Sequence, residues 1–264
     1  MTAAVKYVVN PSARVEGPRN YSLDLGLVVS ALHRSRAIAE QLGAFDVNIF
    51  ELLGMRNLSA FVGEVFAASL AKEAPGMLVK NPHQDGYPDL LLMDSDGKQA
   101  WDRLAARRRD KSPFSPFLTG GFEVKATCGS VPTPEKCSKR GVEKPDLGDQ
   151  RIALMQGYDW KAHHRETNRL FGLLWDFIDG HPTIVAVFYR DDLTTQDWGK
   201  IVQPKANGGR TTSVSIMTRQ SVSKMYSGWV VVIDDPRYAQ FLDRRHNQAL
   251  LAAALGSRAP SSGS

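Results

Sequence analysis

The order of the apolar patterns along the chain is the feature that most constrains its fold. Residues 21–43 repeat apolar side chains at helical spacing, and further helical stretches follow at 46–54 and 57–74. From residue 77 onward the pattern changes to short apolar runs bounded by turn residues, which is typical of β-strands. Helices followed by strands and a crossover predict an α/β fold, with a central mixed β-sheet flanked by helices.

Six short runs are predicted as strands, and the last three are the most apolar. The fourth and fifth are separated only by the turn around Asp179-Gly180, so we expect them to form a hairpin. Helices are predicted at 151–165 and 236–255, whereas the Pro- and Gly-rich stretch 129–149 is predicted to be a long loop. The six predicted strands are 77–80, 87–93, 119–127, 170–177, 183–189 and 229–233.

The length of 264 residues suits one large domain. We predict a single domain over 1–255, with N-terminal helices at 1–75, a core at 56–190 and additional elements at 191–255. The tail 256–264 is rich in small polar residues and is predicted to be disordered.

The cysteine content and the apolar runs indicate a cytoplasmic protein. The two cysteines, Cys128 and Cys137, are too few for a disulfide framework, which favours a reducing compartment. The N-terminus lacks the apolar stretch of a signal peptide, and no apolar run is long enough to span a membrane.

The net charge of +5 is compatible with a polyanionic partner such as nucleic acid, although a basic run can equally be a solvated surface. The basic residues gather in two runs. These runs contain Arg103, Arg107, Arg108, Arg109 and Lys111, and then Lys136, Lys139, Arg140 and Lys144.

Three tripeptides place an acid two positions before a lysine, and only one of them suits a shared site. Residues 96–98 fall in a predicted turn and residues 159–161 in a predicted helix, where positions i and i+2 do not face each other. Glu123 and Lys125 lie on a predicted strand, whose alternation sends both side chains to one face. Asp89, on the preceding predicted strand, is the acidic partner that this geometry allows.

Two carboxylates and a lysine meet the needs of phosphodiester hydrolysis. A hard divalent cation such as Mg²⁺ prefers carboxylate oxygens, and it can activate water and neutralise charge on the phosphate. The alternative interpretation of Asp89, Glu123 and Lys125 is a surface salt bridge, because the bare motif is weak.

These elements resemble the PD-(D/E)xK nuclease superfamily, and within it the type II restriction endonucleases. The matching residues are Pro88-Asp89 on one strand, residues 123–125 on the next, and Glu64 in the preceding helix. The resemblance covers residues 56–127 and extends more loosely to 190. It departs from a tight hairpin between Asp89 and Glu123, so we expect an insertion at 94–118.

The resemblance implies a role for each matched residue. Asp89 and Glu123 would bind Mg²⁺ together with the backbone carbonyl of Val124. Lys125 would orient or polarise the attacking water. Glu64 would bind a second metal or support the site, although a solvated helix position is an equal alternative.

Several residues outside the motif are candidates for DNA contact. The arginines of the predicted insertion would lie beside the active centre, and a polar loop at 205–213 combines glycines with hydrogen-bond donors. Each has a plain alternative: a solvated surface, an ordinary helix histidine or a polar hairpin loop. The candidates are Arg107, Arg108, Arg109, His163, Lys205, Arg210, Thr211 and Thr212.

The resemblance implies a type II restriction endonuclease of a bacterial or archaeal cytoplasm. Such an enzyme would cut double-stranded DNA at a specific sequence with Mg²⁺ and leave 5′-phosphate ends. We expect a homodimer, whose twofold symmetry matches palindromic sites, and a DNA methyltransferase as the genetic partner. In this interpretation 56–190 is the catalytic core and 191–255 includes the DNA-recognition elements. The alternatives are a repair or mobile-element nuclease of the same superfamily, or a non-catalytic DNA-binding protein.

Overall fold

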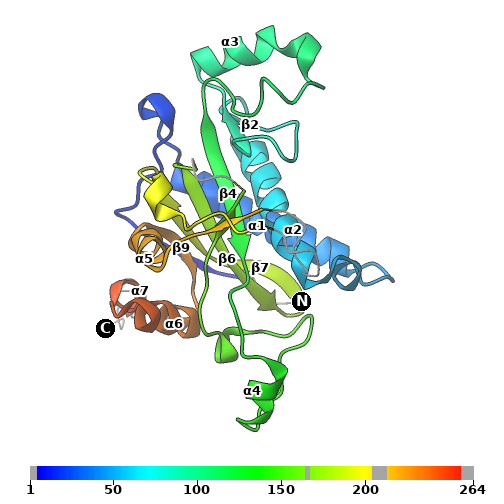
Figure 1. Ribbon diagram of the computed structural model, residues 1–264, viewed down its shortest axis with the longest axis vertical. Helices are drawn as coiled ribbons and strands as arrows, with labels where there is room; N and C mark the ends of the chain where they lie inside the picture. The colour runs from blue at the N-terminus through cyan, green and yellow to red at the C-terminus, as the bar shows by residue number, and fades with distance from the viewer. Residues whose placement is uncertain (1–4, 164–166, 204–212, 257–264) are drawn as a thin grey trace, which may run out of the picture.

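The computed structural model describes residues 5–163, 167–203 and 213–256, and its centre is a seven-stranded sheet (Figure 1). The strand order is β1-β9-β7-β6-β4-β3-β2. Strands β4 and β6 pair in parallel, and the other neighbouring strands pair antiparallel, so the sheet is mixed. The α/β fold with a central mixed sheet flanked by helices is therefore confirmed.

The strands of the large sheet differ in length. The strands are β1 (Tyr7–Val9), β2 (Leu78–Lys80), β3 (Leu90–Leu92), β4 (Gly121–Thr127), β6 (Leu170–Ile178), β7 (His181–Arg190) and β9 (Trp229–Ile233). A separate two-stranded sheet pairs β5 (Lys161–Ala162) with β8 (Ser215–Ile216). The α-helices are α1 (Leu25–Gly43), α2 (Ile49–Glu73), α3 (Ser95–Arg103), α4 (Pro134–Ser138), α5 (Arg219–Ser227), α6 (Pro236–His246) and α7 (Leu250–Gly256). Short 3-10 helices occupy Pro18–Asn20, Ala105–Arg107, Ile152–Leu154 and Thr195–Asp197.

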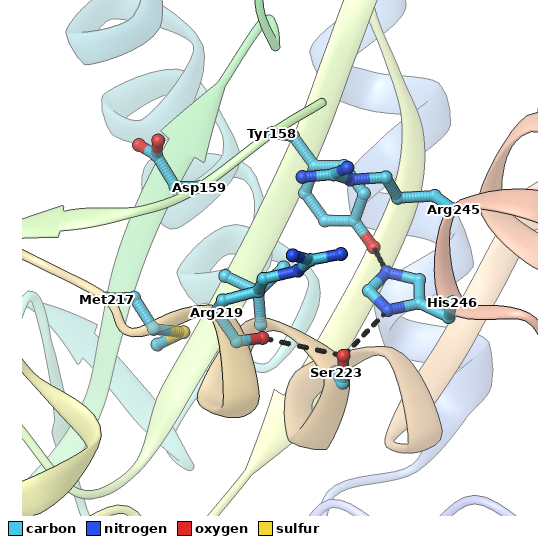
Figure 2. Close-up of a pocket in the computed structure, with 8 residues that line it drawn as sticks. Tyr158, Asp159, Met217, Arg219, Ser223, Arg245 and His246 are labelled. Carbon is cyan, nitrogen blue, oxygen red and sulfur yellow. Dashed lines mark hydrogen bonds between the residues drawn. The ribbon is translucent and has the colours of Figure 1, made fainter. Parts of the chain in front are cut away.

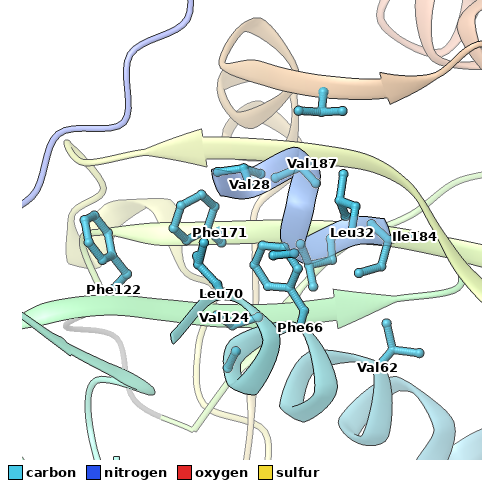
Figure 3. Packing of buried hydrophobic residues seen from close by; sticks show 14 of the residues in the cluster. Val28, Leu32, Val62, Phe66, Leu70, Phe122, Val124, Phe171, Ile184 and Val187 are labelled. Atoms are coloured by element: carbon cyan, nitrogen blue, oxygen red, sulfur yellow. The ribbon is translucent and has the colours of Figure 1, made fainter. Parts of the chain in front are cut away.

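Helices α1 and α2 cover one face of the sheet and bury its larger core (Figure 3). Phe66 and Leu70 of α2 pack with Phe122 and Val124 of β4 and with Phe171 of β6. The predicted alternation of β4 is confirmed, because Phe122 and Val124 are buried in this core and Ala126 packs against it. Burial of this apolar surface is what fixes α2 over β4.

The opposite face is covered by α5, α6 and the segment that leads into β5. Trp160 lies across Gly172 of β6, where a Cβ atom would come within 2.8 Å of the indole ring, so only glycine permits this close packing. Strand β7 serves both cores: Val187 and Tyr189 belong to the first, and Ala186 and Phe188 to the second. Residues 158–163 are thereby held against the sheet, close to β4 and β6.

Three of the predicted elements are wrong in type or extent. The stretch 151–165 is not one helix: within its described part it holds a short 3-10 helix and then the strand β5. Residues 96–98 lie in α3, because Asp94 caps that helix by accepting a hydrogen bond from the backbone N–H of Gly97. The two predicted helices at 46–54 and 57–74 correspond to the two segments of α2, which a kink at Gly54 separates; the φ of +63° there suits glycine. The predicted C-terminal helix is divided into α6 and α7 by Asn247.

Four strands and α-helices were not predicted at all: β1, β8, α4 and α5. Strand β1 is only three residues long and pairs with β9, near the other end of the chain. Helix α4 lies inside the predicted loop 129–149, and helix α5 lies in a Ser-containing stretch of 191–228. The tail 257–264 lies outside the described residues.

Candidate active site

The pairing of β3 with β4 brings the predicted acidic residues together. Leu90 of β3 is the register partner of Phe122 of β4, so Asp89, one residue before β3, lies beside Glu123. The insertion between the two strands, residues 93–120, leaves this antiparallel pairing intact. The predicted partnership of Asp89 and Glu123 therefore has a direct structural basis.

Asp89 and Glu123 are joined by two hydrogen bonds. The backbone N–H of Asp89 donates to Glu123 Oε2 at 3.3 Å, and the backbone N–H of Val124 donates to Asp89 Oδ2 at 2.8 Å. Each carboxylate is thus held by the strand that carries the other one. This arrangement fixes both side chains without a flexible loop.

Lys125 lies next to both carboxylates. Its Nζ forms an ion pair with Glu123 Oε1, lies 3.6 Å from Asp89 Oδ2 and donates to the Val124 carbonyl at 3.2 Å. The shared face predicted for positions 123 and 125 is present. One ammonium group therefore serves two carboxylates, so the trio carries one net negative charge when both carboxylates are ionised.

Burial makes this charge cluster electrostatically unusual. Only 4% of Glu123 is exposed. Burial and the nearby Asp89 carboxylate raise the pKa of Glu123 to about 7, although Lys125 opposes the shift. Burial favours the neutral form of Lys125, but the attraction of Glu123 and Asp89 outweighs it and raises the pKa of Lys125. A surface salt bridge would not show this degree of burial.

The cluster opens into a cavity of about 370 Å³ between α2 and the start of the β5 region. Glu64 of α2 lines this cavity and forms an ion pair with Lys80 of β2 at 2.6 Å. The described residues that line it are Ser59, Ala60, Gly63, Glu64, Ala67, Gln84, Asp85, Asp89, Val124, Lys125, Ala126, Lys161 and His163. We call this cavity the acidic cleft.

Asn81 anchors the loop that leads to Asp89. Its side-chain amide donates to the carbonyls of Pro88 at 2.9 Å and of Phe114 at 3.0 Å, and its backbone N–H donates to the Asp89 carbonyl at 2.9 Å. Asn81 is buried, so these bonds are shielded from water. The loop before β3 and the insertion after it are therefore fastened at one point, which holds Asp89 in place.

His163 lines the acidic cleft, but it reaches that position from β5 and not from a helix. Its Nδ1 lies 3.2 Å from the Ser213 carbonyl, and the side chain is exposed. Lys161 lines the cleft from the same strand and was not among the predicted site residues. The period of two in burial over 158–163, with Tyr158, Trp160 and Ala162 buried, is the signal that could have identified a strand there.

The arginines of the insertion lie away from the lining of the acidic cleft. Arg107 forms an ion pair with Asp110, and the Arg108 guanidinium lies 4.6 Å from the Trp101 ring centre. Arg109 is exposed. The part of the insertion that reaches the rim is Lys111, which forms an ion pair with Asp85 at 2.5 Å. The predicted DNA contacts Lys205, Arg210, Thr211 and Thr212 lie outside the described residues.

The donor set around Asp89 and Glu123 fits one hard divalent cation. Two carboxylates with an uncompensated charge and a neighbouring backbone carbonyl, that of Val124, are oxygen donors of the type that Mg²⁺ prefers. Within residues 5–163, 167–203 and 213–256, no group of three or more His, Cys, Asp or Glu side chains is placed to hold a metal. A cation here would thus depend on two carboxylates, with backbone and water completing its shell.

The chain was also compared with known proteins, and its described residues were searched for membrane-spanning helices. Among the described residues, no helix is both long and apolar enough to cross a membrane. No family model, curated protein or solved structure matches the chain. The case for a function therefore depends on the geometry and chemistry of the acidic cleft.

Proposed function

We propose that this protein is a Mg²⁺-dependent endonuclease that hydrolyses DNA phosphodiester bonds at the acidic cleft. The observation that carries the proposal is the pair of reciprocal hydrogen bonds between Asp89 and the strand of Glu123, with Lys125 beside both carboxylates. Strand neighbours hold these three groups together at the wall of a cavity large enough for a phosphate and its water.

The energetics argue against a purely structural salt bridge. Burying charged groups costs several kcal/mol per ion, and well-packed apolar residues would stabilise the sheet as well or better. The same cost underlies the pKa of Glu123, which burial raises to about 7. A buried charge cluster of this kind beside a cavity is typical of a functional site.

The residues of the cleft have separable roles in this reaction. Asp89, Glu123 and the Val124 carbonyl would hold Mg²⁺, which when bound lowers the pKa of water and offsets charge on the phosphate. Lys125, kept protonated by the two carboxylates, orients the attacking water and stabilises negative charge on the phosphate oxygens. Glu64 lines the cleft as well, and supporting a second cation or the water network would require it to exchange its ion pair with Lys80.

The basic side chains around the cleft support a nucleic-acid substrate. Lys161 and His163 line it opposite α2, and the chain carries a net charge of +5. We propose double-stranded DNA as the substrate, specific cutting as the activity and 5′-phosphate ends as the product. A homodimer in a bacterial or archaeal cytoplasm, paired with a DNA methyltransferase gene, belongs to the same proposal.

A cleavage assay on long DNA tests this proposal. Purified protein with Mg²⁺ is expected to give discrete, reproducible fragments, and EDTA is expected to prevent cutting. Ca²⁺ is expected to permit binding without cutting, because it accepts the same oxygens with a looser geometry. A smear would indicate a nonspecific nuclease, and cutting of branched or mismatched DNA alone would indicate a repair enzyme. DNA binding with no cleavage of any unmethylated DNA would leave a non-catalytic DNA-binding protein.

A further inference from the structure

A second pocket, of about 180 Å³, lies where the segment before β5 meets α5 and the end of α6 (Figure 2). It is separate from the acidic cleft, and none of the described residues lines both cavities. Its lining combines two arginines with aromatic and hydroxyl groups. The lining residues are Tyr158, Asp159, Met217, Arg219, Val222, Ser223, Arg245 and His246.

Two guanidinium groups reach this pocket from different helices. Arg219 is the first residue of α5, and Arg245 lies in the last turn of α6. In Figure 2 both guanidinium groups extend toward the Tyr158 ring, whereas the Asp159 carboxylate points away from them. Within the part of the chain that the structure describes, neither arginine forms an ion pair, and the one carboxylate in the lining, that of Asp159, is not paired with them.

The wall behind the arginines is a fixed network of neutral groups. His246 Nε2 lies 2.7 Å from the Tyr158 hydroxyl, and His246 Nδ1 lies 3.0 Å from Ser223 Oγ. The Tyr226 ring stacks on His246 at 4.3 Å between centres. Burial and the Arg245 charge lower the pKa of His246 to about 4, so the imidazole is neutral at pH 7 and adds no positive charge.

The backbone also leaves room for Arg245. A Cβ atom at Gly157 would lie 3.1 Å from Arg245 Nη2, so the guanidinium lies directly against this glycine. The planar fork of an arginine matches two oxygens of a phosphate, and two such forks can surround one group. We propose that Arg219 and Arg245 bind a phosphate group in this pocket, as part of a DNA backbone or of a smaller phosphorylated compound.

The position of the pocket favours DNA as the source of that phosphate. Asp159 lines the pocket, whereas Lys161 and His163 line the acidic cleft, so both cavities lie along one short segment of the chain. At a rise of about 3.3 Å per residue, an extended stretch from Asp159 to His163 spans about 13 Å. This length corresponds to about four base-pair steps, so one duplex can contact both places.

Binding of a fluorescent 30-base-pair duplex in EDTA tests the pocket without cleavage. Arg219→Ala and Arg245→Ala are each expected to weaken DNA binding roughly tenfold. Each is also expected to make the slope of log K against log salt concentration less steep by about 0.9. Arg244→Ala is the matched control, because Arg244 is an exposed neighbour on α6 outside the pocket. Arg219→Lys keeps the charge but loses the fork, and an intermediate loss is expected from it.

Inorganic phosphate is the probe for the smaller ligand. Millimolar phosphate is expected to raise the melting temperature of the wild type and of Arg244→Ala, but not of the double variant Arg219→Ala/Arg245→Ala. If the arginine variants lose both the stabilisation by phosphate and the affinity for the duplex, the pocket binds the DNA backbone. If they lose only the stabilisation by phosphate, the pocket binds a small phosphorylated compound. Equal behaviour of all variants in both assays overturns the proposal. Neither assay requires cleavage. The phosphate-binding proposal can therefore be wrong while the nuclease proposal is right, and the nuclease proposal can be wrong while the phosphate-binding proposal is right.

Discussion

The two halves of the central sheet differ in how they hold buried carboxylates. In β6, β7 and β9 almost every residue is buried, and both faces are packed under helices or under the segment around Trp160. The buried carboxylate of this half, Asp176, forms no ion pair with a lysine among the described residues, and it accepts hydrogen bonds from the backbone of Arg151 and Phe177 and from the Tyr238 hydroxyl. At the other side, β2 and β3 are three residues long, and β4 carries a buried carboxylate and a half-buried lysine. We call these the central half and the acidic half of the sheet.

This difference shows where a fold can accept charged groups. The central half supplies apolar burial, which is the main stabilising term of folding. The acidic half gives up some of that stabilisation to hold Asp89, Glu123 and Lys125 beside a cavity. Mutations in the two halves should therefore separate stability from activity.

The largest expected effect is on cleavage by variants of the acidic half. Asp89→Asn, Glu123→Gln and Lys125→Ala should each lower the cleavage rate by roughly a thousandfold or more, because groups that act as one unit fail together. A time course of DNA cleavage with Mg²⁺ measures this. Glu123→Gln should keep the melting temperature, since it removes a charge that burial disfavours.

Asp96→Asn and Lys98→Ala provide the matched control for these three variants. They make comparable changes in another acid-x-lysine tripeptide, at exposed positions of α3. Both should cleave DNA at the wild-type rate. Near-normal cleavage by any of the three cleft variants would contradict the role assigned to that residue.

A truncation in the central half should show the opposite pattern. Leu173→Ala in β6 removes a fully buried side chain and should lower the free energy of unfolding by about 2–5 kcal/mol. Urea denaturation measures the loss. At a temperature where the variant is fully folded, its cleavage rate should stay near that of the wild type; a thousandfold loss there would break the division between the two halves.

Charge reversal at Arg107, Arg108 and Arg109 tests whether the insertion beside the acidic half contacts DNA. These exposed arginines lie outside the cleft lining, so their replacement by Glu should weaken DNA binding across all sequences and flatten its salt dependence. Fluorescence anisotropy at several salt concentrations measures both quantities. An unchanged affinity would assign the cluster to a solvated surface.

The smallest expected effect is a pH dependence in the layer that covers the central half. The pKa of His246 is lowered to about 4 from an ordinary value of 6.5, so below pH 6.5 the unfolded chain binds a proton that the folded chain resists. The free energy of unfolding is therefore unaffected by His246 above pH 6.5, and it decreases progressively as the pH falls toward 4. Urea denaturation across this range should give a flatter profile for His246→Gln than for the wild type, and parallel profiles would contradict the prediction.

The sequence predicts best those elements whose pattern is local. The apolar run 229–233 is the strand β9, and the turn at Asp179-Gly180 joins β6 to β7 as predicted. The shared face of positions 123 and 125 follows in the same way from the period of two in a strand. These predictions required no knowledge of distant contacts.

Elements that depend on distant partners were missed or assigned wrongly. Strand β5 pairs with β8, more than fifty residues later, and the short alternation over 158–163 is its only local signal. The places of Lys161 in the acidic cleft and of Arg245 in the second pocket follow from this tertiary arrangement. Propensity yields to packing in such segments.

The insertion between β3 and β4 has a consequence for how such a protein can change. Because the strand pairing holds the two carboxylates, and Asn81 holds the insertion at Phe114, the outer residues 95–110 can be lengthened or exchanged while the carboxylates stay where they are. The entropic cost of a longer loop grows only slowly with its length. The chain thus separates a variable outer segment from a fixed carboxylate cluster, so new contacts can be acquired without moving the proposed active centre.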